Sequence, residues 1–236
     1  MKATPHVSPY LLLTLANLFW AGNWIVSRAS RGELPPVALS FWRWVVALLC
    51  LLPLSLPQVR RDWPQLRAAW AWLLLFGVIS IVAHGEWQRL REFTLNVGDV
   101  WILASVLAWS AYTLLLSRRP AVHPLSFLTA ISVSGLLFLL PFYLWEMASG
   151  RHVIPTPGAL AGIVYTGVFP AFLGYILWNR GVAEIGPARA GLFMHLVPAF
   201  GILLSMIFLG EAPAPYHSAG IALIFAGIWL NTRRIG

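Results

Sequence analysis

The chain has 236 residues, of which 59% are hydrophobic and 10% charged, and its mean hydropathy is +0.75. Soluble globular proteins average roughly 45–50% apolar and about 25% charged residues, so this composition excludes an ordinary soluble domain. Disorder, coiled coil and collagen are excluded too, because they need high charge, heptads or a glycine period. The composition predicts an all-α bundle of helices in a lipid bilayer.

The net charge of +8 would suggest nucleic acid as a partner if the protein were soluble. The 16 Lys and Arg residues instead stand in small groups between apolar runs, and we expect no basic stripe interleaved with surface aromatics. We interpret these groups as topology signals and expect no nucleic-acid partner. The single cysteine, Cys50, lies in an apolar run, so neither an internal disulfide nor a cysteine zinc cluster can form.

Eight apolar segments follow one another along the chain, each long enough for a bilayer core of about 30 Å, which needs roughly 17–25 residues per helix. They are residues 10–28, 36–56, 68–84, 98–117, 124–147, 158–179, 187–209 and 215–231. First-turn positions, where a missing N–H costs little, hold Pro36, Pro124, Pro187 and Pro215. The sequence therefore predicts a polytopic transmembrane bundle of about eight spans.

The cations are distributed unequally between the two sides that eight spans would create. One side would hold Lys2, Arg60, Arg61, Arg67, Arg118, Arg119, Arg180, Arg189, Arg233 and Arg234. The other would hold Arg28, Arg31, Arg89, Arg91 and Arg151. Because cytoplasmic loops carry the Lys and Arg excess, we expect both termini in the cytoplasm.

The two halves of the sequence resemble each other, but unequally. Residues 15–22 match residues 104–111, and residues 36–53 match residues 124–141 at equal proline spacing. After His84 the first half stops matching, whereas the second continues for two more predicted helices. We expect two unequal inverted repeats of three plus five helices: a shortened first repeat over 1–84, a polar connection over 85–97 and a complete second repeat over 98–236.

Several short motifs occur in a recognisable order. They are residues 17–24 (NLFWAGNW), 41–44 (FWRW), 174–179 (GYILWN), 198–200 (PAF) and 210–211 (GE). With them the chain resembles the EamA-domain family of the drug/metabolite transporter superfamily. The resemblance implies an inner-membrane carrier that moves small metabolites, amino acids or drugs, often outward, by alternating access. The chain departs from the family pattern in lacking counterparts of the fourth and fifth helices, and the fourth lines the family's central cavity.

Arg43 lies about two turns into the second predicted span, where a charge typically costs a few kcal/mol unless it faces water or a partner. The family resemblance also places an arginine here, and a guanidinium can hold a substrate carboxylate with two hydrogen bonds. The alternative is that Arg43 snorkels to the outer interface or bonds helix carbonyls.

Aromatic residues recur on one face of the first span of each repeat. Asn17, Trp20 and Trp24 share a face at i, i+3 and i+7, and Trp109 with Tyr112 supplies the matching face in the second repeat. Such walls would suit a planar or partly apolar substrate. Alternatively, the tryptophans belong to interface belts or lipid contacts.

Polar residues mark the sixth and seventh predicted spans. Tyr175 and Asn179 share a face at i and i+4, and they form either a polar gate or, for Asn179, only a cap of the last turn. His195 precedes Pro198 by three residues, and the proline ring frees a backbone carbonyl one turn earlier. His195 either couples transport to protons or stays neutral and bonded between helices.

Two functions remain open at this point. The first is a bacterial inner-membrane carrier, most often an exporter, whose partners are the lipid bilayer and a small organic solute. The second is a transport-inactive module that folds only with a partner or as a homodimer. We expect no enzyme, cofactor or metal, because the sequence has no nucleophile elbow, His-Glu-x-x-His helix or paired intramembrane aspartates.

Overall fold

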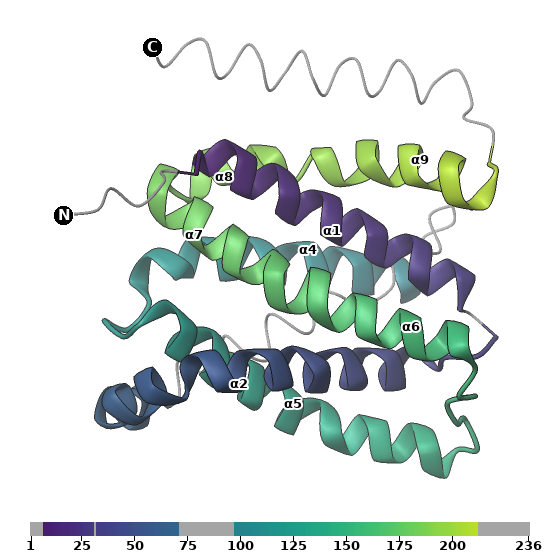
Figure 1. Ribbon diagram of the computed structural model, residues 1–236, viewed down its shortest axis with the longest axis horizontal. Coiled ribbons are helices and arrows are strands. Elements are labelled where there is room, and N and C mark those ends of the chain that lie inside the picture. The colour runs from purple at the N-terminus through teal and green to yellow at the C-terminus, as the bar shows by residue number, and fades with distance from the viewer. Residues whose placement is uncertain (1–6, 31, 71–96, 212–236) are drawn as a thin grey trace. The chain divides into compact units, whose positions relative to one another are not determined.

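The computed structural model describes residues 7–30, 32–70 and 97–211, and every regular element in these residues is a helix (Figure 1). The elements are α1 (Pro9–Ala29), α2 (Pro36–Ala68), α4 (Val97–Leu115), the 3₁₀ turn η1 (Leu116–Arg118), α5 (Pro124–Ala148), α6 (Pro157–Thr166), the π-helix η2 (Gly167–Gly174), α7 (Tyr175–Ile185), α8 (Pro187–Phe193) and α9 (Leu196–Leu209). The all-α class predicted from composition is confirmed.

In the part of the chain that the structure describes, five stretches of helix are long and apolar enough to cross a membrane: Pro9–Ala29, Pro36–Ala68, Pro124–Ala148, Pro157–Ile185 and Pro187–Leu209. They contain five of the eight predicted spans, and α4 covers most of the span predicted over 98–117. Most of the predicted span 68–84 and all of 215–231 lie outside the described residues, as does most of the polar connection 85–97. The number eight therefore stays a prediction.

Proline opens the helices as expected. Pro36, Pro124 and Pro187 are each the first residue of a helix, where the absent N–H has no intrahelical partner to lose. The helix α2 continues past the predicted span 36–56 to Ala68, although Pro57 and Pro64 lie inside it.

The helices gather into two compact units, each drawn from both halves of the sequence. Residues 1–34 and 153–236 form the first unit, with α1 and α6 to α9. Residues 35–152 form the second, with α2, α4 and α5. Because each unit mixes the two halves, the division into repeats over 1–84 and 98–236 stays a prediction from the sequence.

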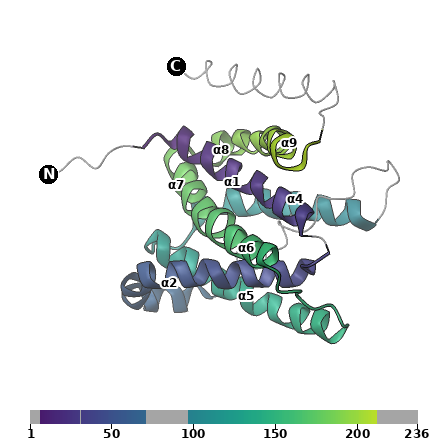
Figure 2. The same cartoon turned by 45° about the vertical axis from the view of Figure 1, so that its right-hand side comes forward.

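In the first unit, α1 contacts all the other helices and lies against α7 and α9 along its length (Figures 1 and 2). The approach to α7 is close enough to require glycine, since a Cβ on Gly181 would lie 2.6 Å from the side chain of Leu13. Small residues at helix crossings bring backbones near each other, which is how membrane helices gain packing energy.

In the second unit, α2 packs along α5, and polar contacts fix the two ends of the pair. At one end the buried carboxylate of Glu146 accepts from the backbone N–H of Ala38 at 2.7 Å and of Val37 at 3.3 Å. At the other end, Asp62 accepts from the backbone N–H of His123 at 2.8 Å. A carboxylate at a helix N-terminus satisfies free N–H groups and favours the helix dipole.

Candidate functional site

The aromatic face predicted on α1 meets a distorted helix in the first unit. The indole Nε1 of Trp20 donates to the backbone carbonyl of Pro170 at 3.0 Å, and both groups are buried. The ring also lies 5.2 Å from the ring of Trp178 and 6.0 Å from that of Tyr175, centroid to centroid. The structure thus brings Trp20 and Tyr175, two residues singled out from the sequence, into contact.

The partner segment of Trp20 is η2, eight residues of π-helix that separate α6 from α7. Pro170 has no N–H to give to the preceding turn, so the regular i→i−4 ladder cannot pass through it. A Cβ on Gly174 would lie 2.9 Å from Nε1 of Trp20, so only glycine leaves room for the indole there. π-Helical turns in otherwise regular helices are frequent at functional sites.

Sequence reasoning missed this distortion. A signal was present, because residues 167–174 read GVFPAFLG, with a proline in mid-span between two glycines. A proline at that position predicts a break in the helix, and flanking glycines predict close approach of another element.

Asn17 is the second buried residue of the α1 face. Its amide nitrogen donates to the carbonyl of Leu13 at 2.7 Å, and its Oδ1 has no hydrogen-bond partner among the described residues. The side chain is 0% exposed. A buried acceptor without a donor is unfavourable by roughly 1–3 kcal/mol, so Asn17 carries unsatisfied polarity into an apolar helix packing.

The remaining residues predicted in this unit differ in burial. Tyr175 and Asn179 are both buried, one turn apart on α7. Trp24 is half-buried with its ring against Gly201 of α9, where an added Cβ would lie 3.1 Å away. The predicted aromatic face of the first span, α1, is therefore packed against α7 and α9 rather than exposed as an aromatic belt.

His195 and Pro198 lie at a break between α8 and α9, and both are exposed. The sequence predicts one continuous span over 187–209, with His195 deep inside it. The break has a physical reason: without an N–H on Pro198, the carbonyl of Met194 accepts from Val197 at 3.1 Å in a tighter turn. The carbonyl that Pro198 deprives of its regular donor is thus satisfied within the turn itself.

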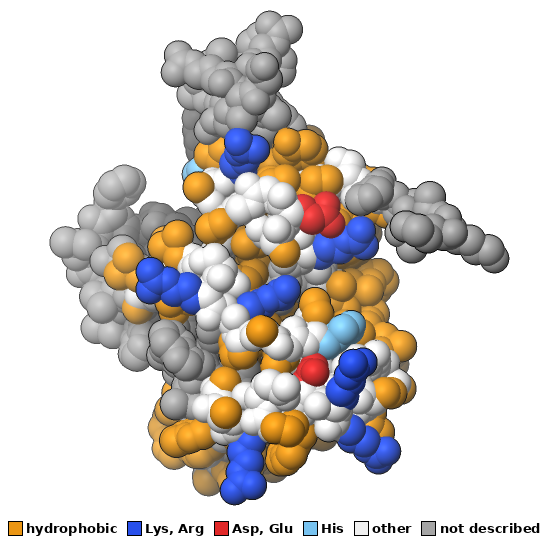
Figure 3. Space-filling view, turned by 90° about the vertical axis from the view of Figure 1, so that its left-hand side faces the viewer, with side chains coloured by type: hydrophobic (Ala, Val, Ile, Leu, Met, Phe, Trp, Pro, Cys, Tyr) orange, Lys and Arg blue, Asp and Glu red, His pale blue; other side chains and the backbone are white. Residues whose placement is uncertain are grey.

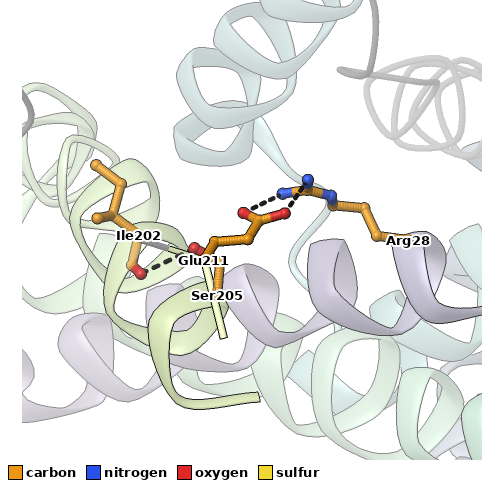
Figure 4. A network of polar contacts seen from close by, with 4 residues as sticks. All are labelled: Arg28, Ile202, Ser205 and Glu211. Atoms are coloured by element: carbon orange, nitrogen blue, oxygen red, sulfur yellow. Dashed lines mark hydrogen bonds and ion pairs between the residues drawn. The ribbon is translucent and has the colours of Figure 1, made fainter. Parts of the chain in front are cut away.

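At one end of the first unit, Arg28 and Glu211 form a two-pronged ion pair (Figure 4). Nη1 of Arg28 donates to Oε2 of Glu211 at 3.0 Å, and Nη2 donates to Oε1. Glu211 follows Gly210, which ends α9 in the left-handed region with φ of 65°. The pair ties the end of α1 to the end of α9.

In the second unit, Arg43 is 4% exposed, eight residues into α2. The guanidinium is therefore enclosed by protein rather than extended to an exposed surface. Buried charges need a partner or water, because desolvating an ion is strongly unfavourable.

Trp109 and Tyr112 stack on each other on α4, with ring centroids 5.3 Å apart, and Tyr112 is 0% exposed.

Within the described ranges there is no group of three or more His, Cys, Asp or Glu side chains that would hold a metal ion. The site residues predicted from the sequence carry amide, indole, phenol, guanidinium and imidazole groups. Groups of this kind recognise solutes by hydrogen bonding and stacking.

The chain matches the model of the EamA-like transporter family over residues 7–87 and 96–233. It is 31% identical over 160 residues to the uncharacterized transporter YetK of Bacillus subtilis, covering 67% of this chain and 48% of that protein. It is 22% identical over 284 residues to an uncharacterized transporter of Archaeoglobus fulgidus, covering 95% of this chain and 97% of that protein.

A third similar protein is described as a probable terminal-alkyne amino-acid exporter of Streptantibioticus cattleyicolor. It is 36% identical over 101 residues, covering 43% of this chain and 33% of that protein. The chain spans about half the length of YetK and a third of the exporter. With a family match over most of its residues and helices fit to cross a bilayer, the chain belongs to the EamA-like transporter family and is a multi-pass membrane protein.

Proposed function

We propose that the protein is a carrier in the bacterial inner membrane that exports a small organic solute carrying a carboxylate, such as an amino acid, by alternating access. The family match over residues 7–87 and 96–233 is the observation that carries this proposal. The name of one relative, a probable amino-acid exporter, supports the solute class and the direction.

Arg43 supplies the charge for such a solute. Burying a guanidinium in a membrane helix costs free energy, so such a residue is kept where function or structure requires it. The planar guanidinium of Arg43 matches the geometry of a carboxylate. Intramembrane ionisable residues commonly mark the path of a substrate. We therefore assign the solute's carboxylate to Arg43.

The first unit supplies polar recognition and a place to bend. Amide, indole and phenol groups lie on α1 and α7, on Asn17, Trp20, Trp24, Tyr175 and Asn179. Alternating access requires helices that change shape, and η2 offers a segment with weakened helical hydrogen bonding beside Trp20. Trp109, Tyr112, His195 and Pro198 remain candidate pathway residues.

The topology belongs to the same proposal. Eight spans in unequal inverted repeats, with both termini in the cytoplasm, agree with the charge bias of the sequence. The alternative is a transport-inactive or partner-dependent module, which the short alignment to YetK and the interruption after His84 favour.

A flux measurement distinguishes the two functions. Purified protein in liposomes is given a pooled mixture of amino acids and other metabolites, and the internal solutes are measured by mass spectrometry against empty liposomes. The variants are Arg43→Ala and Arg43→Lys, with Arg151→Ala as an exposed-arginine control in the same unit.

We expect carboxylate-bearing solutes to accumulate, and Arg43→Ala to reduce their flux at least about tenfold, because hydrogen bonds to charged groups contribute roughly 1.5–3 kcal/mol. Arg43→Lys keeps the charge and should retain part of the flux, while Arg151→Ala keeps all of it. Folded protein that moves no solute would favour the inactive module. Flux of uncharged solutes that is independent of Arg43 would contradict the assigned role.

A further inference from the structure

α2 is longer than a membrane requires. Its 33 residues span about 50 Å at 1.5 Å per residue, whereas a bilayer core is about 30 Å thick. The predicted span 36–56 already covers that thickness. The rest of the helix, residues 57–68, together with the two residues that follow it, is named the α2 extension. Pro53, Pro57 and Pro64 lie inside α2, and its ribbon changes direction toward its C-terminal end (Figures 1 and 2).

One face of the α2 extension alternates arginine and tryptophan. Arg60, Trp63 and Arg67 are spaced by three and four residues, so they lie in one row along α2, and Trp70 follows three residues after Arg67, just beyond the end of the helix at Ala68. All four are exposed, Trp63 by 60% and Trp70 by 62%. We call this row the Arg–Trp stripe. The sequence was expected to hold no basic stripe interleaved with surface aromatics, and these exposed residues correct that expectation.

Contacts on the side of the extension next to the stripe fix the direction of the stripe. Leu66 is 5% exposed, and Asp62 accepts from the backbone N–H of His123 in the connection before α5. The helix therefore cannot rotate its tryptophans inward without losing these contacts. Asp62 is also the only acid in the extension, and its carboxylate is engaged there.

The surroundings of the stripe are basic. Arg61 lies next to the stripe on the helix. Arg118 and Arg119 stand a few residues before His123, whose backbone N–H donates to Asp62. Arg60, Arg61 and Arg67 are exposed at this end of α2, and Figure 3 shows Lys and Arg side chains beside hydrophobic ones on the face it views. An anion approaching this end meets positive charge.

We propose that the Arg–Trp stripe binds the headgroups of anionic phospholipids in the membrane that α2 crosses. Arginine forms bidentate hydrogen bonds with phosphate, and tryptophan is enriched at the level where headgroups meet hydrocarbon. The occupant follows from continuity: the same helix lies in the bilayer a few turns earlier, so lipid headgroups are the phosphates closest at hand. The stripe anchors the cytoplasm-facing end of the second unit to the bilayer surface.

Native mass spectrometry of the purified full chain tests this proposal. Protein in mild detergent is incubated with an equimolar mixture of phosphatidylglycerol and phosphatidylcholine, and the retained lipids are counted. The variants are Arg67→Gln and Arg60→Gln/Arg67→Gln. The matched control is Arg151→Gln, which removes an exposed arginine beyond the far end of α5. Circular dichroism and gel filtration confirm that each variant is folded.

The wild-type protein is expected to retain phosphatidylglycerol in preference to phosphatidylcholine. Each lost arginine should reduce the preference about fivefold, since a basic residue near an anionic surface contributes about 1 kcal/mol. Trp63→Ala should weaken retention of both lipids, because it removes the interfacial ring rather than a charge. An unchanged preference in the double variant, or an equal loss in Arg151→Gln, would overturn the proposal. So would full competition by inorganic phosphate at the lipid concentration, because the site would then not recognise lipid.

Discussion

Trp20 is the residue that joins most features of the first unit. Its indole donates to the carbonyl of Pro170, and its ring contacts those of Tyr175 and Trp178. The hydrogen bond lies beside the π-helix, where the proline has already removed a donor from the backbone ladder. Trp20 therefore holds the distorted segment against α1.

Replacing Trp20 by phenylalanine keeps an aromatic ring but leaves the carbonyl of Pro170 without this donor. We expect Trp20→Phe to lower the free energy of unfolding by roughly 1 kcal/mol, the range found for hydrogen bonds within membrane proteins. Unfolding in sodium dodecyl sulfate, followed by circular dichroism, measures the change. The matched control is Trp145→Phe, since that indole is 63% exposed on α5. Equal losses in both variants would show that ring size, rather than the hydrogen bond, matters.

For single residues, the sequence predicted which side chains share a helix face better than it predicted which residues they contact. The helical spacing of Asn17, Trp20 and Trp24 predicts one shared face of α1, and in the structure Asn17 and Trp20 are buried and Trp24 is half-buried. The partner of Trp20 was beyond reach, because Pro170 is 150 residues away and no local pattern records such a contact. The structure shows that Arg43 is buried, and its role in binding solute stays a prediction.

Among the elements, α2 shows how tertiary contacts override local propensity. Pro57 and Pro64 each remove a helical hydrogen bond, yet the helix continues to Ala68. The bond from the His123 N–H to Asp62 ties this end of α2 to the start of α5. A pairing between segments 61 residues apart cannot be read from helix signals in the sequence.

Asp62 makes the junction pH-dependent. The His123 N–H, which donates to its carboxylate, is the main cause that lowers the pKa of Asp62 below its ordinary value of 3.8. A lowered pKa in the folded state means that the contribution of Asp62 to stability is present above pH 3.8 and is lost as the pH falls through the lower, folded pKa. We therefore expect Asp62→Asn to lower the Tm at pH 6, with the difference from wild type shrinking below about pH 4. Thermal unfolding in detergent at both pH values checks this; a difference that grows on acidification would contradict it.

The start of most helices could be predicted, whereas their interruptions could not. Proline at the first position is a local signal, and it correctly marked the helices that begin at Pro36, Pro124 and Pro187. The π-helix and the break before Leu196 depend on which carbonyls find substitute donors, and those donors come from the folded chain.

For the whole molecule, composition alone predicted the class of protein, and the family match confirms it. The grouping of helices was not predictable in the same way. A division along the chain would keep α1 with α2, but α1 packs with α6 to α9 instead. This packing requires glycine at positions such as Gly174 and Gly181, because an added Cβ would clash with Trp20 or Leu13, and the sequence does not reveal those neighbours.

We propose that the protein is a carrier that works by alternating access, and trans-stimulated exchange tests this proposal most directly. Proteoliposomes loaded with a radiolabelled solute found in the flux screen are diluted into buffer with or without the unlabelled solute. Because a loaded carrier returns faster than an empty one in such a cycle, we predict that external unlabelled solute accelerates the release of label, and that Arg43→Ala abolishes the acceleration. Release at the same rate with and without external solute, from folded protein, would contradict alternating access.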